Sequence, residues 1–316
     1  MRPLRTPGAA FLSYWILGVS ESRVSDMVLL YLAQMINSGL ALGSVYGLMA
    51  LGFSLVYNSS RLINFAQGEL LLLSGLGLYS LTQAFSLNPL VAVAAAGLWG
   101  LLLGVALYAT TLGFSLRKHP LKQLMLTVAA SMTWQGIAIL VWGKKPLMLP
   151  QLLPFSSFRL GPLFFSQDTL TALALAVGSG ALLSLFLRHT RWGRAIRAVS
   201  MNPLAATLQG VNPKKAYALT FALAGLLAAL AGMAVGPQTM LRYDMGLGVG
   251  LKGFVAATLG GYSSLSMVFL GGICLGLLEA LLILTMGAEI KEAVTYVILI
   301  AILVLTPHKE REAARA

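Results

Sequence analysis

The chain has 316 residues, of which 10% are charged and 58% are hydrophobic, and its 22 basic and 10 acidic residues give a net charge of +12. Soluble proteins carry about 25% charged residues, so this chain lacks the polar surface that several soluble domains would need. The composition favours a membrane protein, and the residues left over after the apolar segments are too few for an ATPase, kinase or protease domain.

Residues 1–26 precede the first long apolar segment and are expected to be an N-terminal extension. Within them, residues 9–19 are apolar and follow Arg2 and Arg5, as in a secretory signal, but no small-residue cleavage site follows. Because the chain from Met27 onward would be complete without this extension, we expect a start assigned too far upstream.

Segments free of charged residues predict the membrane spans, because a helix needs about 20 mostly apolar residues to cross the hydrocarbon core. The charge-free run from 70 to 116 is too long for one helix, and Asn88 and Pro89 divide it. The prediction is an all-α, polytopic membrane domain over residues 27–306, with a polar tail at 307–316. Its eight expected spans cover residues 30–56, 69–86, 90–115, 122–142, 168–188, 217–236, 266–286 and 291–306.

Residues 250–262 form a further apolar segment that is bounded by glycines and too short to cross as a regular helix. Irregular backbone at membrane depth is tolerated only where protein buries it or where it lines a cavity. This segment is therefore predicted to be a re-entrant or half-helix.

The densest basic segment indicates which side of the protein faces the cytoplasm. It contains no acidic residue and carries Arg188, Arg191, Arg194, Arg197, Lys214 and Lys215. Cytoplasmic loops are enriched in basic residues, so this loop is placed inside, together with Arg61, Arg117, Lys118 and Lys122. The opposite side receives Lys144, Lys145, Arg159, Arg242 and Lys252. The basic excess is thus interpreted as a topology signal and not as a nucleic-acid footprint.

Glycines at four-residue spacing predict where helices pack closely, because small residues let helix backbones approach each other in a bilayer. The glycines expected to do so are Gly39, Gly43, Gly47, Gly100, Gly104, Gly232, Gly236, Gly272 and Gly276.

Two acidic residues occur where the membrane makes them costly. Glu279 lies inside the seventh predicted span, and a charge at bilayer depth costs about 2.5 to 3.5 kcal/mol on insertion scales. It is expected to face the bundle interior, either as part of a polar path or as a structural hydrogen-bond partner. Glu69 follows Gly68 at a helix start, where the helix dipole favours an anion.

Residues 191–216 contain the start and stop residues of a short helix. Asn202 is a favourable cap, Pro203 suits the first helical position and Gly210 suits the stop. The short helix between them is either a docking element for a partner protein or an interfacial helix lying on anionic lipid.

Three segments resemble one family of transporters. The loop just described resembles the coupling loop of ATP-binding-cassette importer permeases through Gly193, Arg197, Ala198, Asn202, Ala205, Ala206, Gly210 and Val211. Residues 39–69 and 250–281 resemble the opening and the C-terminal segment of the branched-chain amino acid permease family. The chain departs from the family pattern at Gln67, where histidine is usual, in its less charged coupling helix, and at residues 263–266.

The resemblance implies one half of a heterodimeric pore in the cytoplasmic (inner) membrane of a bacterium or archaeon. It implies a second homologous permease, two cytoplasmic ATPase subunits that use ATP and Mg²⁺, and an extracytoplasmic substrate-binding protein. This chain itself would bind no cofactor. It would contact membrane lipid and no nucleic acid. The residues implied to couple it to the ATPases are Gly193, Arg197, Ala198, Asn202, Pro203, Leu204, Ala205, Ala206 and Gly210.

The substrates implied by the resemblance are branched-chain or other small apolar amino acids. Urea or a short amide is the alternative within the family, and an ion-driven secondary transporter is the alternative from another class. Polar groups and glycines near bilayer depth can present donors to a small zwitterion. The residues predicted for the translocation path are Gly43, Tyr46, Asn64, Gln67, Glu69, Gly260, Gly261 and Glu279.

No catalytic residue or metal site is expected. The sequence lacks a GxxxxGK[ST] phosphate loop and the GxSxG and HExxH patterns, and His119, His189 and His308 lack the spacing of a metal site. Cys274, the single cysteine, lies in an apolar segment and is expected to be a small packing residue. The chain is thus predicted to be a transport subunit and not an enzyme.

Overall fold

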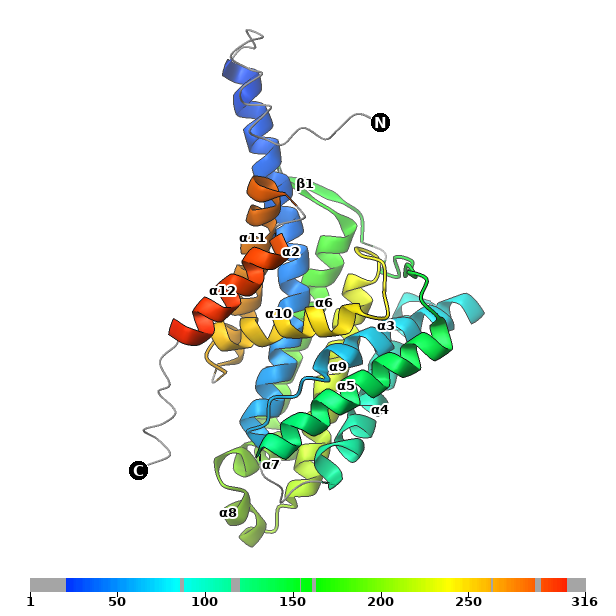
Figure 1. The fold of residues 1–316 in the computed structure, drawn as a ribbon, viewed down its shortest axis with the longest axis vertical. Coiled ribbons are helices and arrows are strands. Elements are labelled where there is room, and N and C mark those ends of the chain that lie inside the picture. Colours follow the sequence, from blue (N-terminus) through cyan, green and yellow to red (C-terminus); the bar gives the residue numbers. More distant parts are fainter. Residues whose placement is uncertain are drawn as a thin grey trace.

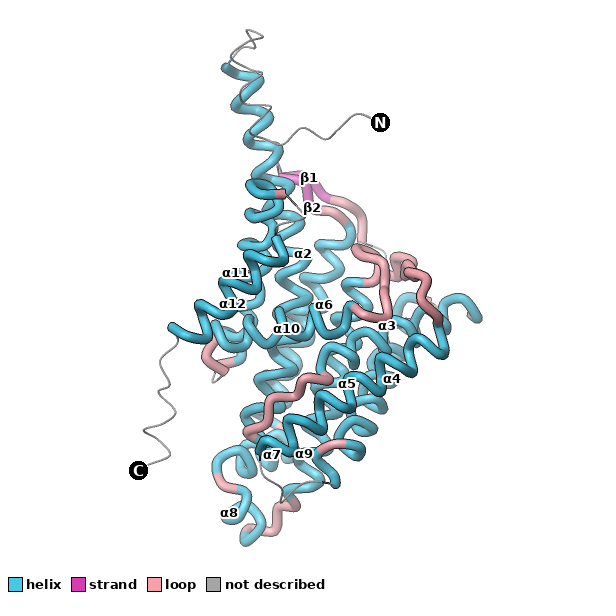
Figure 2. The backbone as a smooth tube through the Cα atoms, viewed as in Figure 1, coloured by secondary structure: helices cyan, strands magenta, loops and turns pink. Residues whose placement is uncertain are grey.

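The computed structural model describes residues 21–85, 88–114, 120–153, 155–160, 163–262, 264–287 and 291–305. Helices dominate this part of the chain (Figures 1 and 2). They are α2 (Glu21–Ser60), α3 (Gln67–Ala84), α4 (Pro89–Thr110), the 3₁₀ turn η1 (Leu112–Phe114), α5 (Pro120–Trp142), α6 (Gln167–His189), α7 (Arg191–Met201), α8 (Pro203–Leu208), α9 (Pro213–Val235), α10 (Met245–Leu259), α11 (Leu265–Met286) and α12 (Lys291–Leu305).

Each of the eight predicted spans is helical, as α2, α3, α4, α5, α6, α9, α11 and α12. Six of these, namely α2, α4, α5, α6, α9 and α11, are long and apolar enough to cross a membrane. The other two fall short, because α3 carries polar residues in its first turn and α12 has 15 residues. The predicted all-α, multi-pass architecture is confirmed, with six full-length apolar spans in the described residues where eight were expected.

Local capping explains why the chain breaks between helices where it does. The side chain of Asn88 accepts a hydrogen bond from the backbone N–H of Leu90, and Pro89 occupies the first helical position of α4. Asn212 and Pro213 start α9 in the same way. The two asparagine side chains satisfy N–H groups that a helix start leaves without a partner. Asn88 and Pro89 separate α3 from α4, as predicted.

The predicted half-helix is α10, which has 15 residues and lies across the direction of α2 in Figure 1. It starts five residues before the predicted segment 250–262 and ends at Leu259, just before Gly260 and Gly261. The backbone then turns through Gly261 and Tyr262, whose φ angles are +70° and +57°. The short helix α10 and the turn that follows it lead back to the start of α11, where Gly261 and Ser264 are exposed.

The helices pack around a core formed mainly by α2, α3 and α9. α2 contacts α11, α9 and α10, while α4 packs along α9 (Figure 1). The large side chains that are fully buried include Phe221, Leu48, Met49, Leu70 and Leu71. This core buries the first turn of α3 and one side of α10, whereas Leu247 and Leu259 on the other side of α10 are exposed.

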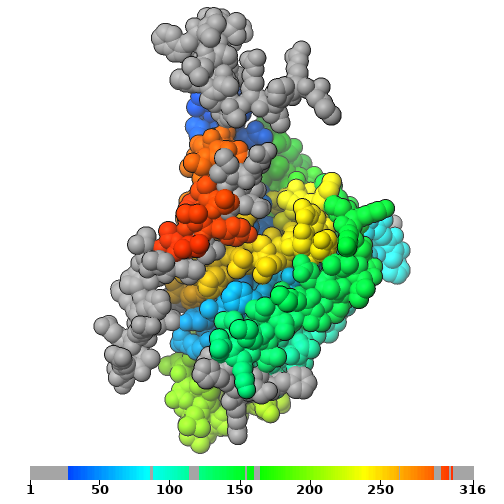
Figure 3. Space-filling view, viewed as in Figure 1, coloured from blue at the N-terminus to red at the C-terminus, as the bar shows by residue number. Residues whose placement is uncertain are grey.

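The two ends of the molecule differ in structure. A small antiparallel hairpin, β1 (Phe158–Leu160) and β2 (Leu163–Phe165), lies at the end opposite α8 (Figure 2). This hairpin was not predicted. The segment that contains α8 protrudes from the other end (Figure 3). Arg159 and the basic loop therefore lie at opposite ends, as the predicted topology requires.

Some predictions concern residues that are not described or that lie elsewhere than expected. Residues 1–20 and 306–316, Arg117 and Lys118 lie outside the described residues. The expected boundary at residue 27 falls inside α2, which begins at Glu21. The prediction that Cys274 is a packing residue is wrong, because its side chain is exposed on α11.

Candidate functional site

The loop between α6 and α9 folds into the two short helices α7 and α8. Thr190 caps α7 by accepting a hydrogen bond from the N–H of Gly193 at 2.9 Å. The Asn202 side chain caps α8 by accepting from the N–H groups of Leu204 and Ala205, both at 3.0 Å. Beyond α8, Gly210 has a φ of +81°, a conformation that glycine adopts without strain. Local residues therefore specify this helix.

A small apolar cluster fixes α8 to the rest of the protein. It consists of the buried residues Ile196, Val199, Ala206 and Ala216. Gly193 lies against the end of α6, where a side chain would overlap the backbone of Phe186 and Leu187. Ala206 thus faces inward and supports the helix, while its neighbours face solvent.

The outer surface of α8 is apolar although it lies at the end of the molecule. Leu204 and Leu208 on α8 are 72% and 80% exposed, and Met201, the last residue of α7, is 87% exposed. A groove of about 660 Å³ runs beside them, lined by Pro203, Thr207, Gly210, Val211, Asn212, Pro213, Lys214 and Tyr217. Exposed apolar side chains next to a groove form a surface that a partner protein can cover.

A second cluster lies inside the bundle, where Tyr46, Lys252 and Glu279 meet. The Lys252 ammonium nitrogen lies 2.7 Å from Oε1 of Glu279. The Tyr46 hydroxyl donates to Oε2 of Glu279 at 2.6 Å, and Lys252 also donates to that hydroxyl oxygen at 3.4 Å. We call these three residues the buried triad. They join α2, α10 and α11, and they neutralise each other's charge.

The buried triad settles where Glu279 points and corrects one prediction. Glu279 faces the bundle interior, as its cost in lipid required. The prediction that Lys252 lies in an outer loop is wrong, because α10 carries it into the core, where it is 7% exposed. The cost argument applied to Glu279 applies equally to a lysine inside an apolar segment, so the partner of Glu279 was detectable.

Two of the predicted path residues, Asn64 before α3 and Gln67 in its first turn, share a hydrogen-bond network. The Gln67 side chain donates to the carbonyl of Ala224 on α9 at 3.1 Å, and its oxygen accepts from the Asn64 side chain at 3.4 Å. Asn64 in turn accepts from the N–H of Ala66 at 3.1 Å. The amide group of Gln67 thus ties α3 to α9, and Asn64 supports it from the preceding loop.

Glu69 lies at the same helix start and is only 1% exposed. Its Oε1 accepts a hydrogen bond from the hydroxyl of Ser131 at 3.2 Å. Its Oε2 has no hydrogen-bond partner among the described residues. The carboxylate faces the first turn of α10, where a side chain on Gly246 would come within 3.0 Å of it. Glu69 therefore retains an acceptor directed at the half-helix.

The remaining predicted path residues are glycines at close contacts and turns. A side chain on Gly43 would lie 2.8 Å from the Cα atom of Ile273 on α11. Gly260 approaches the backbone of Met267 and Val268 at the start of α11, and Gly261 adopts a positive φ with open space around it. Gly43 and Gly260 thus allow α2 and α10 to approach α11 closely, and Gly261 allows the turn between α10 and α11.

The predicted packing glycines other than Gly236 lie where helix backbones nearly touch. Gly43 and Gly47 on α2 face Gly276 and Gly272 on α11, and a side chain at any of the four would come within 3.0 Å of the facing helix. Gly39 approaches Leu277 along the same contact between α2 and α11. Gly100 and Gly104 on α4 lie against Gly225 and Phe221 on α9, Gly232 lies against Leu71, and Gly236 lies against Leu149.

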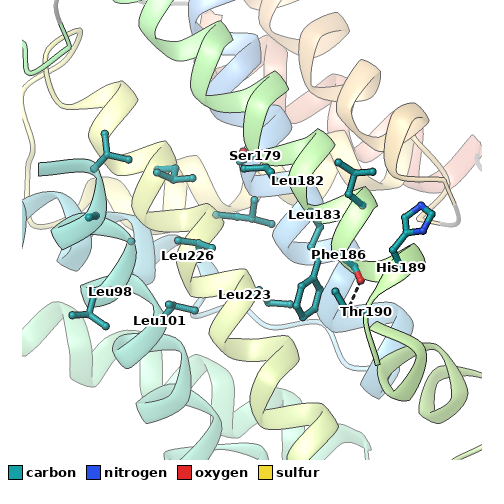
Figure 4. Close-up of a pocket in the computed structure, with 16 residues that line it drawn as sticks. Leu98, Leu101, Ser179, Leu182, Leu183, Phe186, His189, Thr190, Leu223 and Leu226 are labelled. Atoms are coloured by element: carbon teal, nitrogen blue, oxygen red, sulfur yellow. Dashed lines mark hydrogen bonds between the residues drawn. The ribbon is translucent and has the colours of Figure 1, made fainter. Parts of the chain in front are cut away.

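The described part of the chain also contains a large apolar groove. It has a volume of about 780 Å³ and lies between α4, α6 and α9. Figure 4 shows leucines such as Leu98, Leu182 and Leu226 on its walls, with His189 and Thr190 at one end. Thr190 donates to the carbonyl of Phe186 at 2.7 Å. The walls offer a zwitterion few polar partners, so the groove is a poor substrate site.

Comparison with known proteins places this arrangement in a family. A family model described as "Branched-chain amino acid transport system / permease component" matches residues 35–303. The high-affinity branched-chain amino acid transport system permease protein LivH of Salmonella typhimurium is 31% identical over 301 residues, 90% of this chain and 96% of LivH. Its counterpart BraD of Pseudomonas aeruginosa is 31% identical over 296 residues, 88% of this chain and 94% of BraD.

Two other matches are more distant. The ribose import permease protein RbsC of Escherichia coli is 28% identical over 278 residues, 85% of this chain and 84% of RbsC. The solved structure of PsaBC from Streptococcus pneumoniae in complex with Fab aligns with a TM-score of 0.49 and 13% identity, over 87% of this chain and 92% of that chain. On the family model and the relatives at 31% identity, this chain belongs to the family of permease components of branched-chain amino acid transport systems, as a multi-pass membrane protein.

Proposed function

We propose that this chain is one of two homologous permease subunits of an ATP-binding-cassette importer for branched-chain amino acids. Two cytoplasmic ATPase subunits would supply the energy from ATP and Mg²⁺, and an extracytoplasmic binding protein would deliver the substrate. The family model and the relatives at 31% identity, all named for branched-chain amino acid transport, support the amino acid class.

The observation that carries the proposal is the surface of α8. A helix of six residues, fixed from below by Ala206 and capped by Asn202, presents Leu204 and Leu208 to the outside. Exposed leucines at the tip of a basic loop are costly in water and gain stability when a partner covers them. An ATPase groove that receives α8 would transmit its own movement to α6 and α9, to which the loop is joined.

We place the translocation path along α10. One side of this half-helix is buried in the bundle, and that side meets two polar groups, the buried triad and Glu69. The free oxygen of Glu69 can accept a hydrogen bond from the ammonium group of an amino acid. The neutral Lys252 and Glu279 pair supports a structural role for Glu279 rather than ion coupling.

The decisive experiment is reconstitution with a matched pair of variants. The permease, its partner permease, the ATPases and the binding protein are placed in liposomes, and uptake of labelled leucine is measured with and without ATP. We expect ATP-dependent uptake that Leu204→Asp together with Leu208→Asp abolishes, with loss of ATPase co-purification. Leu121→Asp, at an exposed leucine in the first turn of α5, is the control and should leave co-purification unchanged.

Each rival predicts a different result. Uptake of labelled urea, a short amide or ribose in preference to leucine would show that the substrate is not a branched-chain amino acid. Uptake driven by a proton gradient without any ATPase would establish a secondary transporter. ATPase co-purification that survives both leucine substitutions would contradict the role given to α8.

A further inference from the structure

A polar pocket of about 620 Å³ opens at the end of the bundle that carries α8. We call it the arginine pocket, because Arg61, Arg188 and Arg197 line it. The ion pairs found among the described residues are Arg242 with Asp244 and Lys252 with Glu279, so no carboxylate there pairs with these three arginines. Gathering like charges costs free energy that a bound anion would offset.

The arginines are held in place by contacts that do not neutralise them. Arg61 adopts a φ of +55°, an unfavourable conformation for a residue other than glycine. Its guanidinium carbon lies 5.8 Å from the centre of the Tyr57 ring, which in turn packs 4.5 Å from the Tyr262 ring. Arg197 donates from Nη2 to the carbonyl of Arg188 at 3.4 Å, which holds those two residues together.

The far wall of the arginine pocket is the start of α11, and it is fastened to α2. The side chains of Ser54 and Asn58 donate to the Tyr262 carbonyl at 2.7 and 2.6 Å. Ser264 makes no capping hydrogen bond, and it lines the pocket together with Ser266. A helix start offers backbone N–H groups and a positive dipole end, so this wall adds donors for an anion to the three guanidinium groups.

The position of the pocket matches the surface of a membrane. Arg188 is the penultimate residue of the span Gln167–His189, and Arg61 follows the last residue of the span Val28–Ser60. The basic loop places this end in the cytoplasm. The pocket also has apolar walls, formed by Leu55, Leu187, Ile196, Met201 and Leu265. Basic pockets at this depth suit a lipid head group, and apolar walls suit the chain attached to it.

We propose that the arginine pocket binds the phosphate group of an anionic phospholipid of the inner leaflet. The planar guanidinium groups can bind phosphate oxygens in pairs, while the hydroxyls of Ser264 and Ser266 and the first turn of α11 complete the donor set. The glycerol and the first part of an acyl chain lie along the apolar walls. A soluble phosphate ester shares the head-group chemistry but leaves those walls exposed to water.

The test is lipid titration of the purified permease in neutral detergent, followed by native mass spectrometry. We expect phosphatidylglycerol to be retained, phosphatidylcholine not to be retained, and glycerol 3-phosphate not to displace the bound lipid. The triple variant Arg61→Gln, Arg188→Gln, Arg197→Gln should lower lipid affinity about 100-fold, at about fivefold for each arginine. The measurement needs no ATPase and no substrate, so it stands apart from the proposed transport function.

A second triple variant controls for loss of charge. Arg191→Gln, Arg194→Gln and Lys215→Gln also remove three charges, but from positions of the basic loop outside the pocket. This variant should lower lipid affinity less than about threefold, because exposed charges are screened within about 10 Å. Thermal unfolding in detergent shows whether each variant is folded. The triple Arg→Lys variant, which keeps the charge but loses the paired hydrogen bonds, should bind about tenfold more weakly than the native chain.

Three outcomes would overturn the proposal. Equal loss of affinity in both glutamine triples would mean diffuse attraction and no pocket. Displacement of the lipid by glycerol 3-phosphate would make the ligand a soluble phosphate ester. Unchanged lipid binding in the pocket variant, with loss of ATPase co-purification, would make the arginines a contact for an acidic protein surface.

Discussion

The ammonium nitrogen of Lys252 lies 2.7 Å from a carboxylate oxygen of Glu279, and both side chains are almost completely buried. The two residues belong to α10 and α11, and Tyr46 extends the contact to α2. Burying a charge is costly unless it is paired and hydrogen-bonded, and here each charge has both kinds of partner. The half-helix therefore has a fixed point in the core of the bundle.

Breaking this pair from one side should destabilise the protein strongly. Glu279→Gln leaves the Lys252 ammonium buried without a counter-charge, and we expect a loss of about 3 to 5 kcal/mol in the free energy of unfolding. Replacing both residues by Lys252→Met and Glu279→Leu should recover most of that loss. Unfolding of the purified protein in detergent provides the measurement.

The exposed ion pair of the same chain is the control for that experiment. Arg242 and Asp244 also lie 2.7 Å apart, but their side chains are 60% and 37% exposed. Arg242→Gln should therefore cost no more than about 1 kcal/mol. Equal losses for Arg242→Gln and Glu279→Gln would show that the buried triad contributes no special stability.

Close packing of α4 on α9 should make Gly104 intolerant of even a methyl group. A side chain there overlaps the backbone of Phe221 and Ala222, so Gly104→Ala should destabilise the protein by about 1 to 3 kcal/mol. Gly178→Ala, inside α6 where nothing lies within 4 Å of the new methyl, is the matched change. It should be neutral or stabilise by up to about 1 kcal/mol. We expect the melting temperature to fall in Gly104→Ala and to stay the same or rise in Gly178→Ala. A similar fall in both variants would contradict the close contact between α4 and α9.

Substitution beneath α8 should unfold the loop, whereas substitution on its outer surface should not. Ala206 is 4% exposed, and Ala206→Glu forces a carboxylate into the small apolar cluster below the helix. We expect trypsin to cut the basic loop at least about tenfold faster, because local unfolding exposes the arginines. Leu204→Asp should leave the cleavage rate unchanged. Equal rates in both variants would mean that Ala206 does not anchor α8.

The free oxygen of Glu69 should matter for transport more than for folding. Glu69→Gln keeps the size of the side chain and removes a carboxylate buried with one unpaired oxygen, so the melting temperature should stay the same or rise. Uptake of leucine by the reconstituted importer should fall at least about tenfold, since a charge-assisted contact to an ammonium group contributes about 1.5 to 3 kcal/mol. Ser131→Ala is the comparison, and should lower the melting temperature because it leaves Oε1 unpaired as well. Full uptake by Glu69→Gln would remove Glu69 from the path.

Features that depend on neighbouring residues were predictable from the sequence. The start of α8 at Asn202 and Pro203, its stop at Gly210 and the break before α4 at Asn88 follow from local capping. The interior position of Glu279 followed from the cost of a charge in lipid. Each needs only the residue and its surroundings along the chain.

Features that depend on distant partners were not predictable in the same way. Tyr46 and Glu279 are separated by 233 positions in the sequence, and Ser131 and Glu69 by 62. The inward direction of Ala206 depends on how α7 folds back under α8, which capping residues do not encode. The arginine pocket likewise arises from helix ends that only the tertiary structure brings together.

The Tyr262 carbonyl, which accepts hydrogen bonds from both Ser54 and Asn58, has a consequence for movement. The glycines Gly43, Gly47, Gly272 and Gly276 interlock α2 with α11, and the buried triad joins both helices to α10. Sliding any one of them alone would break several of these contacts together, so α2, α10 and α11 should travel as a single rigid body. In the transport cycle proposed above, this block would therefore move as one unit.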